Sequence, residues 1–442
     1  MRIQLSEHFT YPKLLRFTLP SIIMMIFTSV YSVVDGVFVS NFAGKTPFAA
    51  VNLIMPLLII TGAPGFMVGT GGSAIVAKTL GQGKPELANR HFSLLVCAAA
   101  IGGAAVGWLG CALARPAAIA LGARGEMLEH CVVYARIILA ANPFFILQNV
   151  FQSFFIAAEK PKLGLYVTAG AGLTNIALDA LLVGVFHWGV AGAALATILS
   201  QAVGGLVPAA YFLRKNDSLL RLVRPRFDGR VLVRTCANGS SELMSNISGS
   251  VVAMLYNFQL LRLAGEDGVA AYGSIMYVNF IFAAIFLGYS IGSAPVVSYH
   301  YGAENTGELR SLLRKSLVLT GGGGMLMAGL GLLAAAPLSH IFVGYDQGLY
   351  ELTVRGFRLY AVSYLLCGFN IFGSSFFTAL NNGLASAVIS FLRTLVFQCA
   401  SVLVLPIFLG VDGIWLAITV AEAAALAVTG VLLAGYRRVY RY

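Results

Sequence analysis

Charged side chains are scarce in this sequence. Aspartate, glutamate, lysine and arginine supply 11% of its 442 residues, whereas a soluble domain typically contains about 25%. Hydrophobic residues supply 58% and form long continuous runs. These runs exceed the alternating segments of about ten residues that build a transmembrane β-barrel. The scarcity of charge therefore excludes an ordinary soluble protein and predicts an all-α polytopic membrane protein.

Signatures of catalysis and of nucleotide binding are also missing. The six cysteines are scattered and form no C-x-x-C pair, which argues against a metal or disulfide role. The stretch GTGGSA (69–74) lacks the Lys-Ser/Thr that completes a phosphate-binding loop, and no Ser-His-Asp set is apparent. We therefore expect neither enzyme activity nor a cofactor, and active transport by this chain would have to use an ion gradient.

Twelve apolar segments are long enough to cross a bilayer, which takes about 20 residues. They cover residues 14–42, 48–78, 92–114, 129–157, 163–186, 190–213, 233–264, 269–300, 312–336, 352–380, 383–409 and 411–436. If the N-terminus is cytoplasmic, 21 of the 29 lysines and arginines lie on the cytoplasmic side. Because cytoplasmic loops carry an excess of basic residues, we expect both termini in the cytoplasm and the protein in the inner (plasma) membrane.

The net charge of +11 is a topology signal in this interpretation. A nucleic-acid partner would require a basic surface on one soluble domain. The sequence contains no such domain, so no nucleic acid is expected.

The two halves of the sequence resemble each other at an offset of about 221 residues. GVAGAALATILSQ begins at Gly189 and GVDGIWLAITVAE at Gly410, while AAVNLIM at Ala49 matches AAYGSIM at Ala270. Six helices return the chain to its starting side, so the sequence predicts two pseudo-symmetric six-helix lobes, a design common among secondary transporters. The expected parts are an N-lobe (1–213), a cytoplasmic linker (214–232) and a C-lobe (233–442).

Polar side chains inside the apolar segments are few, so each is a candidate for function. A charged residue at the middle of a membrane helix costs roughly 2.5–3.5 kcal/mol, yet Asp35 lies in the first segment and Asp179 in the fifth. Asn175 shares a helix face with Asp179, and Thr197 lies in the sixth segment. At about 1.5 Å of rise per residue, all four reach a similar depth in the outer half of the bilayer.

Two carboxylates at one depth suit the exchange of a proton or the capture of a small hard cation such as Na⁺. For Asn175 and Thr197 taken alone, ordinary hydrogen bonding between helices is favoured. At the repeat offset of 221–222, Asp35 aligns with Tyr256 or Asn257, and Asp179 with Ala400 or Ser401. The scaffold is thus expected to be symmetric and the chemistry asymmetric, with one ion-coupling site in the N-lobe.

Further polar residues are candidates for a substrate cavity. Glu242 and Glu422 could contact a cationic substrate or take part in coupling, and for Glu422 a packing or hydrogen-bonding role is about as well supported. Arg393 could pair with a carboxylate, line the cytoplasmic-side cavity or extend toward the cytoplasm. The complete set of cavity candidates is Tyr31, Gln148, Gln152, Glu242, Asn370, Arg393 and Glu422.

Pro20 is about four turns before Asp35 in the first segment. A proline inside a helix removes a backbone hydrogen bond and kinks the helix. Near an ion site, such a kink is a candidate moving part, although a static bend held by packing is common in membrane helices.

These features resemble the multidrug and toxic compound extrusion (MATE) family over nearly the whole chain. The most specific stretches are VVDGVFVSNFAG with Pro20 upstream, TNIALDALLV and GVAGAALATILSQ. In the DinF-like branch of that family, an N-lobe cation or proton site lies on the positions held here by Asp35, Asn175, Asp179 and Thr197. The NorM-like branch uses acids in the C-lobe, and Glu242 is the candidate for one of these.

The resemblance implies export of amphipathic, often cationic, drugs in exchange for H⁺ or Na⁺ by alternating access. It implies that Pro20 lets the first helix bend, and we expect a monomer surrounded by membrane lipid. The alternative is a lipid-linked oligosaccharide flippase of the same superfamily, although such flippases usually carry more helices and a more cationic cavity. A channel or receptor would show no uphill flux.

Overall fold

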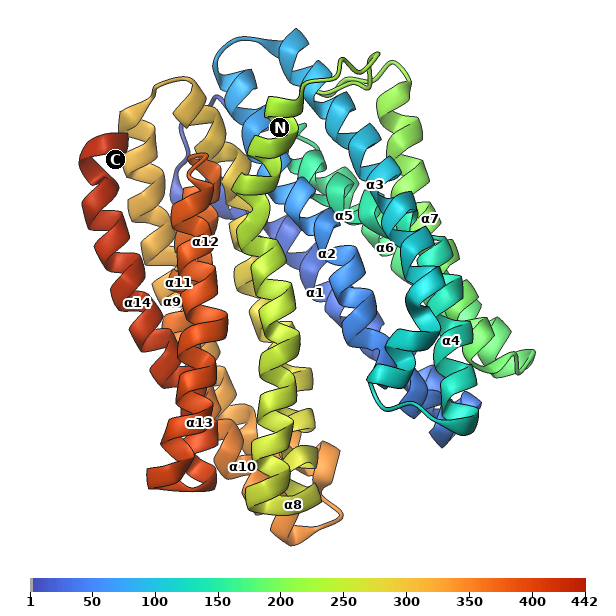
Figure 1. Ribbon diagram of the computed structural model, residues 1–442. Coiled ribbons are helices and arrows are strands. Elements are labelled where there is room, and N and C mark those ends of the chain that lie inside the picture. Colours follow the sequence, from blue (N-terminus) through green and yellow to red (C-terminus); the bar gives the residue numbers. More distant parts are fainter. Residues whose placement is uncertain (1–2) are drawn as a thin grey trace.

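The computed structural model describes residues 3–442, and within that range it consists of helices and connecting turns without a β-strand (Figure 1). Long apolar segments favour helices in lipid because each backbone N–H finds its acceptor within the same segment. The helices are α1 (Tyr11–Phe38), α2 (Lys45–Gly81), α3 (Pro85–Ala120), α4 (Gly125–Ala140), α5 (Asn142–Ala157), α6 (Pro161–Leu178), α7 (Gly189–Leu213), α8 (Gly229–Gly302), α9 (Thr306–Val343), α10 (Gln347–Ala361), α11 (Tyr364–Ala379), α12 (Gly383–Phe391), α13 (Gln398–Leu409) and α14 (Val411–Tyr440).

Three short π-helical segments interrupt or end the α-helices. They are η1 (Val39–Ala43), η2 (Asp179–Val185) and η3 (Leu392–Phe397). Such segments often occur at functional sites, and η2 and η3 begin at or next to two of the polar residues singled out above.

The described residues contain the twelve membrane spans that the sequence predicts. Nine helices are long and apolar enough to cross a membrane, and the bent pairs α4–α5 (56°) and α10–α11 (47°) raise the number to eleven. The 74-residue α8 leaves helical geometry at Gly265, where φ is 63°, so it contains two spans. The all-α polytopic fold is therefore confirmed, while the breaks in the fourth and tenth spans were not predicted.

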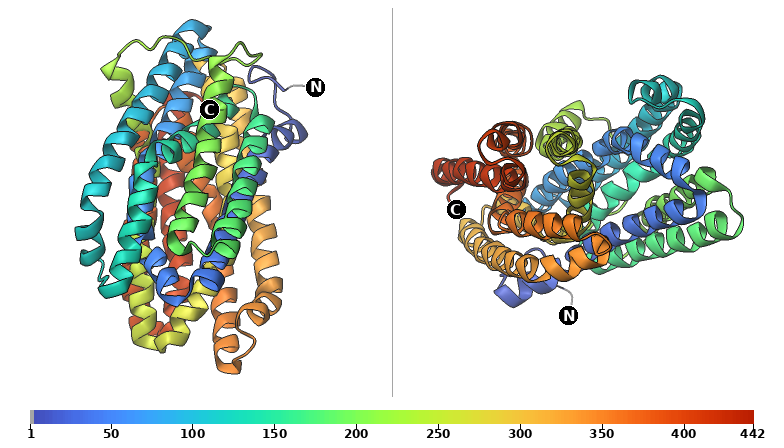
Figure 2. Two further views of the ribbon diagram at one scale, coloured as in Figure 1. Left: turned by 90° about the vertical axis from the view of Figure 1, so that its right-hand side faces the viewer. Right: turned by 90° about the horizontal axis from the view of Figure 1, so that it is seen from below.

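The spans form two lobes, with α1–α7 in the N-lobe and α8–α14 in the C-lobe (Figure 1). The lobes converge at the end that carries both termini and diverge toward the opposite end, and Figure 2 shows the same two groups from the side and from below. Helices α2 and α8 approach each other so closely at the convergent end that each needs a glycine at the contact. A Cβ on Gly81 of α2 would collide with the carbonyl oxygen of Tyr299, and a Cβ on Gly302 of α8 would collide with that of Lys78.

The repeat is visible in the backbone as well as in the sequence. Gly81 and Gly302 are 221 residues apart, as are the carbonyl groups they approach. Positive φ angles recur at offsets of 221 or 222 in the turns between spans. The pairs are Gly44 and Gly265, Gly83 and Glu304, Glu159 and Asn381, and Gly189 and Gly410.

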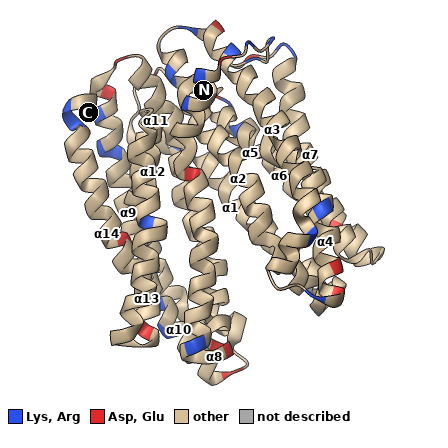
Figure 3. Cartoon of the chain, viewed as in Figure 1, with Lys and Arg blue, Asp and Glu red and all other residues tan. Residues whose placement is uncertain are grey.

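The N-terminal segment ties the two lobes together at the convergent end. The backbone N–H of Leu5 donates to Glu159 of the N-lobe (2.7 Å), and that of Phe9 donates to Glu308 of the C-lobe (2.9 Å). Both apolar side chains are fully buried. Lysines and arginines also gather at this end (Figure 3).

The polar linker ends earlier than predicted. Helix α8 begins at Gly229, because the Asp228 carboxylate accepts hydrogen bonds from the N–H groups of Arg230 (3.0 Å) and Val231 (3.4 Å) and caps the helix. Residues 229–232, expected in the linker, are therefore helical.

Candidate ion and substrate site

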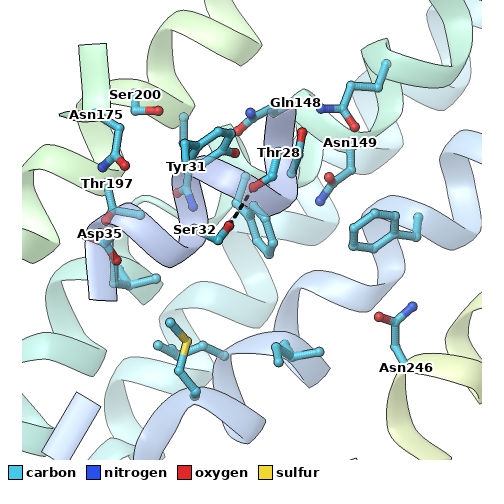
Figure 4. Close-up of a pocket in the computed structure, with 18 of the residues that line it drawn as sticks. Thr28, Tyr31, Ser32, Asp35, Gln148, Asn149, Asn175, Thr197, Ser200 and Asn246 are labelled. Carbon is cyan, nitrogen blue, oxygen red and sulfur yellow. Dashed lines mark hydrogen bonds between the residues drawn. The ribbon is translucent and has the colours of Figure 1, made fainter. Parts of the chain in front are cut away.

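A cavity of about 330 Å³ lies in the N-lobe and opens between the lobes. All but one of its lining residues belong to the N-lobe, and the exception is Asn246 of α8. Aromatic and aliphatic side chains such as Phe66, Phe145 and Met55 cover much of the wall, and amide and hydroxyl groups interrupt them (Figure 4). A mostly apolar pocket with a few polar groups is the usual form of a small-molecule site.

The two carboxyl groups singled out in the sequence meet beside this cavity. Asp35 lies in the last turn of α1 and lines the cavity, and Asp179 begins η2 and is fully buried behind it. The two groups interact electrostatically. No described residue donates a hydrogen bond to either carboxylate oxygen of Asp179 or to the Oδ1 of Asp35.

Asn175 and Thr197 lie on the same side of the cavity as Asp35 (Figure 4). Asn175 is 2% exposed and stands one turn before Asp179. The Thr197 hydroxyl donates to the carbonyl oxygen of Ala193 (3.0 Å) within α7. Because the hydroxyl proton is used in this hydrogen bond, the hydroxyl can act toward the cavity only as an acceptor. A bound cation requires such an oxygen lone pair.

Tyr31, Gln148 and Gln152, three of the cavity candidates from the sequence, also line this cavity. Other lining groups were not among the candidates: Tyr134, Asn149, Ser200, Gln201 and Asn246. Helical spacing offered a signal for two of them, since Ser200 follows Thr197 by three residues and Asn246 follows Glu242 by four.

The remaining candidates lie elsewhere. In the C-lobe, the Arg393 Nε lies 2.8 and 3.0 Å from the two oxygens of Glu422. Asn370 donates to Glu422 Oε2 (2.7 Å), and Thr429 donates to the Asn370 oxygen (2.9 Å). Of the three alternatives for Arg393, the structure shows pairing with a carboxylate.

Glu242 does not line the Asp35 cavity, but its carboxyl group lies within electrostatic range of Arg393. It lines a space of only about 20 Å³ between the lobes, together with serines such as Ser290 and Ser375. Pro20 is buried inside α1 and faces a third cavity, at the convergent end of the molecule. Neither residue contacts the Asp35 cavity.

This arrangement can hold a small cation but not a typical transition metal. Within residues 3–442 there is no group of three or more His, Cys, Asp or Glu side chains of the kind that binds such a metal. None of the described residues that line the Asp35 cavity is a lysine, arginine or histidine. A buried carboxylate without a basic partner must take up a proton or a cation, and the amide and hydroxyl oxygens nearby suit a hard ion.

Comparisons with known proteins agree with this architecture. A family model described as MatE matches residues 20–181 and 243–402. The multidrug export protein MepA of Staphylococcus aureus (strain MRSA252) is 24% identical over 425 residues, which cover 93% of this chain and 91% of MepA.

Solved structures show the same fold. An outward-facing multidrug resistance MATE transporter of the MOP superfamily superposes with a TM-score of 0.93 at 22% identity, covering 99% of this chain and 98% of that chain. A MATE protein in complex with MaL6 gives the same TM-score, identity and coverage. With a family match in both lobes, this chain belongs to the MATE family of membrane transporters.

Proposed function

We propose that this protein is a cation-coupled antiporter that exports amphipathic, often cationic, small molecules. The observation that carries the proposal is the buried pair Asp35 and Asp179, which borders an apolar cavity without a basic residue among its described lining. The multidrug export function in the name of MepA supports the substrate class. The placement of the acid pair on the DinF-like pattern favours that branch of the family.

In this mechanism the acid pair releases its ion when substrate enters and regains it when substrate leaves. Two carboxylates at close range repel each other unless a proton or cation sits between them. Asn175 and Thr197 complete the ion site with an amide and a hydroxyl oxygen. Refilling from outside would neutralise the wall of the cavity, weaken its attraction for a cationic substrate and promote release.

The two-lobe architecture supports alternating access. The lobes converge at the end with both termini and diverge toward the other (Figure 1). Basic residues at the terminal end support a cytoplasmic position for that end in the plasma membrane, so this conformation would face outward. Pro20, inside α1, would let this helix bend as Asp35 gains or loses its ion, and one chain would contain the whole pathway.

The oligosaccharide flippase alternative is less well supported. A lipid-linked oligosaccharide carries phosphate, which requires basic groups along its path. The acid-bordered cavity offers none among its described lining residues.

The test is drug exchange in proteoliposomes under imposed gradients. A pH gradient and a sodium gradient are applied separately, and uphill drug movement and ion counterflow are both measured. Drug accumulation driven by either gradient supports the proposal and identifies the ion. Equilibration of drug without accumulation under both gradients would indicate a channel and overturn it.

A further inference from the structure

The cavity that Pro20 faces, of about 320 Å³, lies on the N-lobe at the convergent end. It is enclosed by the start of α1, the N-terminal segment and the turn between α5 and α6. It shares no lining residue with the Asp35 cavity. Neither the ion site nor the drug pathway accounts for it.

Its polar groups are mostly basic. Arg16, Lys160 and Lys162 line it together with one acid, Glu159. Lys160 is held by Asp217, with 2.6 Å between Nζ and Oδ2, and Glu159 accepts the Leu5 N–H. Arg16 and Lys162 are exposed, and no hydrogen bond or ion pair joins either to the rest of the described chain. Arg16 and Lys162 thus face the cavity unpaired within the described chain, and Glu159 is the one acid that lines the cavity beside them.

The other side of the cavity is apolar. Phe17, Pro20 and Leu163 form this wall. On the outer surface beside it, Leu19 follows Arg16 by three residues and is 50% exposed, and Tyr166 follows Lys162 by four residues and is 68% exposed. On a helix, residues at these spacings share a face. Each basic group therefore has an exposed apolar or aromatic neighbour one turn deeper in the membrane.

We propose that this cavity binds the phosphate of an anionic phospholipid, with Arg16 and Lys162 holding the phosphate and Leu19 and Tyr166 contacting the acyl chains. Basic pockets between membrane helices bind anionic headgroups in this way. The volume is at the lower end of the range for small-molecule sites, which suits a headgroup whose chains remain outside. Free phosphate would use the same basic groups but would gain nothing from the apolar flank.

The experiment measures lipid retention by native mass spectrometry. The full-length protein is purified with phosphatidylglycerol or with phosphatidylcholine of the same chain composition. The variant Arg16→Gln/Lys162→Gln removes the two charges. The matched control, Lys84→Gln/Arg310→Gln, removes two other exposed charges at the same end, one in the turn before α3 and one near the start of α9. Arg16→Lys keeps the charge and should keep binding, and unchanged thermal unfolding confirms that each variant is folded.

We expect wild type and control to retain phosphatidylglycerol in preference to phosphatidylcholine, and the double variant to bind it roughly 25-fold more weakly, about fivefold for each charge. Equal retention by the double variant, or an equal loss in the control, would overturn the site. Displacement of the lipid by millimolar inorganic phosphate or glycerol phosphate would overturn the lipid assignment.

Discussion

The N-lobe and the C-lobe bury carboxyl groups in different ways. In the N-lobe, Asp35 and Asp179 lie together with no basic residue among the described lining of their cavity. In the C-lobe, Glu422 is held by Arg393 at 2.8 and 3.0 Å and by Asn370 at 2.7 Å. A buried carboxylate needs a compensating charge. The C-lobe supplies this charge from the Arg393 side chain, whereas in the proposed mechanism the N-lobe takes it from solution.

The internal sequence repeat shows which residues of one lobe replace the buried charges of the other. At offsets of 221 and 222, Glu422 aligns with Gln201 and Asn370 with Gln148, both of which line the N-lobe cavity. Each lobe thus carries buried charge where the other has a neutral side chain. An antiporter of this design would have one exchangeable ion site and one fixed ion pair on the same scaffold.

The largest expected effect is on coupled transport. Asp35→Asn should reduce gradient-driven drug efflux to the level of empty vesicles, because an amide cannot exchange a proton. Arg393→Gln/Glu422→Gln, which removes both charges of the C-lobe pair, should keep transport close to wild type. The measurement is uphill drug flux in proteoliposomes at equal protein content.

Asp267→Asn, an exposed carboxylate in the α8 turn, is the matched control for Asp35→Asn. Full efflux by Asp35→Asn would refute the N-lobe site. Loss of efflux in the folded C-lobe double variant would show that coupling is shared between the lobes.

The second expected effect is on stability. Arg393→Gln alone leaves Glu422 buried without a cation and should lower the free energy of unfolding by roughly 3–5 kcal/mol. Adding Glu422→Gln should recover much of the loss, since no unpaired charge remains. Thermal unfolding of both variants in detergent checks this.

If the double variant is no more stable than Arg393→Gln, an unpaired Glu422 does not explain the loss of stability in the single variant. That outcome would point to packing of the arginine side chain instead.

The sequence predicted the scaffold better than the contacts within it. Apolar length located the twelve spans, and equal depth from the membrane surface grouped Asp35 with Asp179. Depth, however, does not fix rotation about the helix axis, so pairing of Arg393 with a carboxylate remained one of several alternatives and Glu422 was not identified as the partner. The breaks in spans four and ten and the π-helical turns at Asp179 and Leu392 depend on tertiary packing. Pro143, three residues after the end of α4 and in the first turn of α5, was the one local signal for a break.

A third test concerns the scaffold, which should respond equally in both lobes. Gly189 and Gly410 occupy the same repeat position, with φ angles of 57° and 58°. An added Cβ would meet no atom within 4 Å at either site, so alanine would cost only backbone strain, roughly 1–3 kcal/mol. Thermal unfolding of Gly189→Ala and Gly410→Ala should therefore show similar losses. A difference larger than about 1 kcal/mol would mean that the lobes are not equivalent even in their turns.

The smallest expected effect comes from the outer end of the C-lobe network. Thr429 donates to Asn370, which in turn donates to Glu422. Thr429→Val removes one hydrogen bond at nearly constant volume and should lower the free energy of unfolding by about 1 kcal/mol.

Thr320→Val is the matched control, because the Thr320 hydroxyl is also buried in the C-lobe but bonds only to carbonyl groups of its own helix. A cost at Thr429 above that at Thr320, and its disappearance in the Arg393→Gln/Glu422→Gln background, would show that Thr429 acts through the ion pair. Equal costs in both backgrounds would confine its role to local packing and leave Glu422 dependent on Arg393 and Asn370 alone.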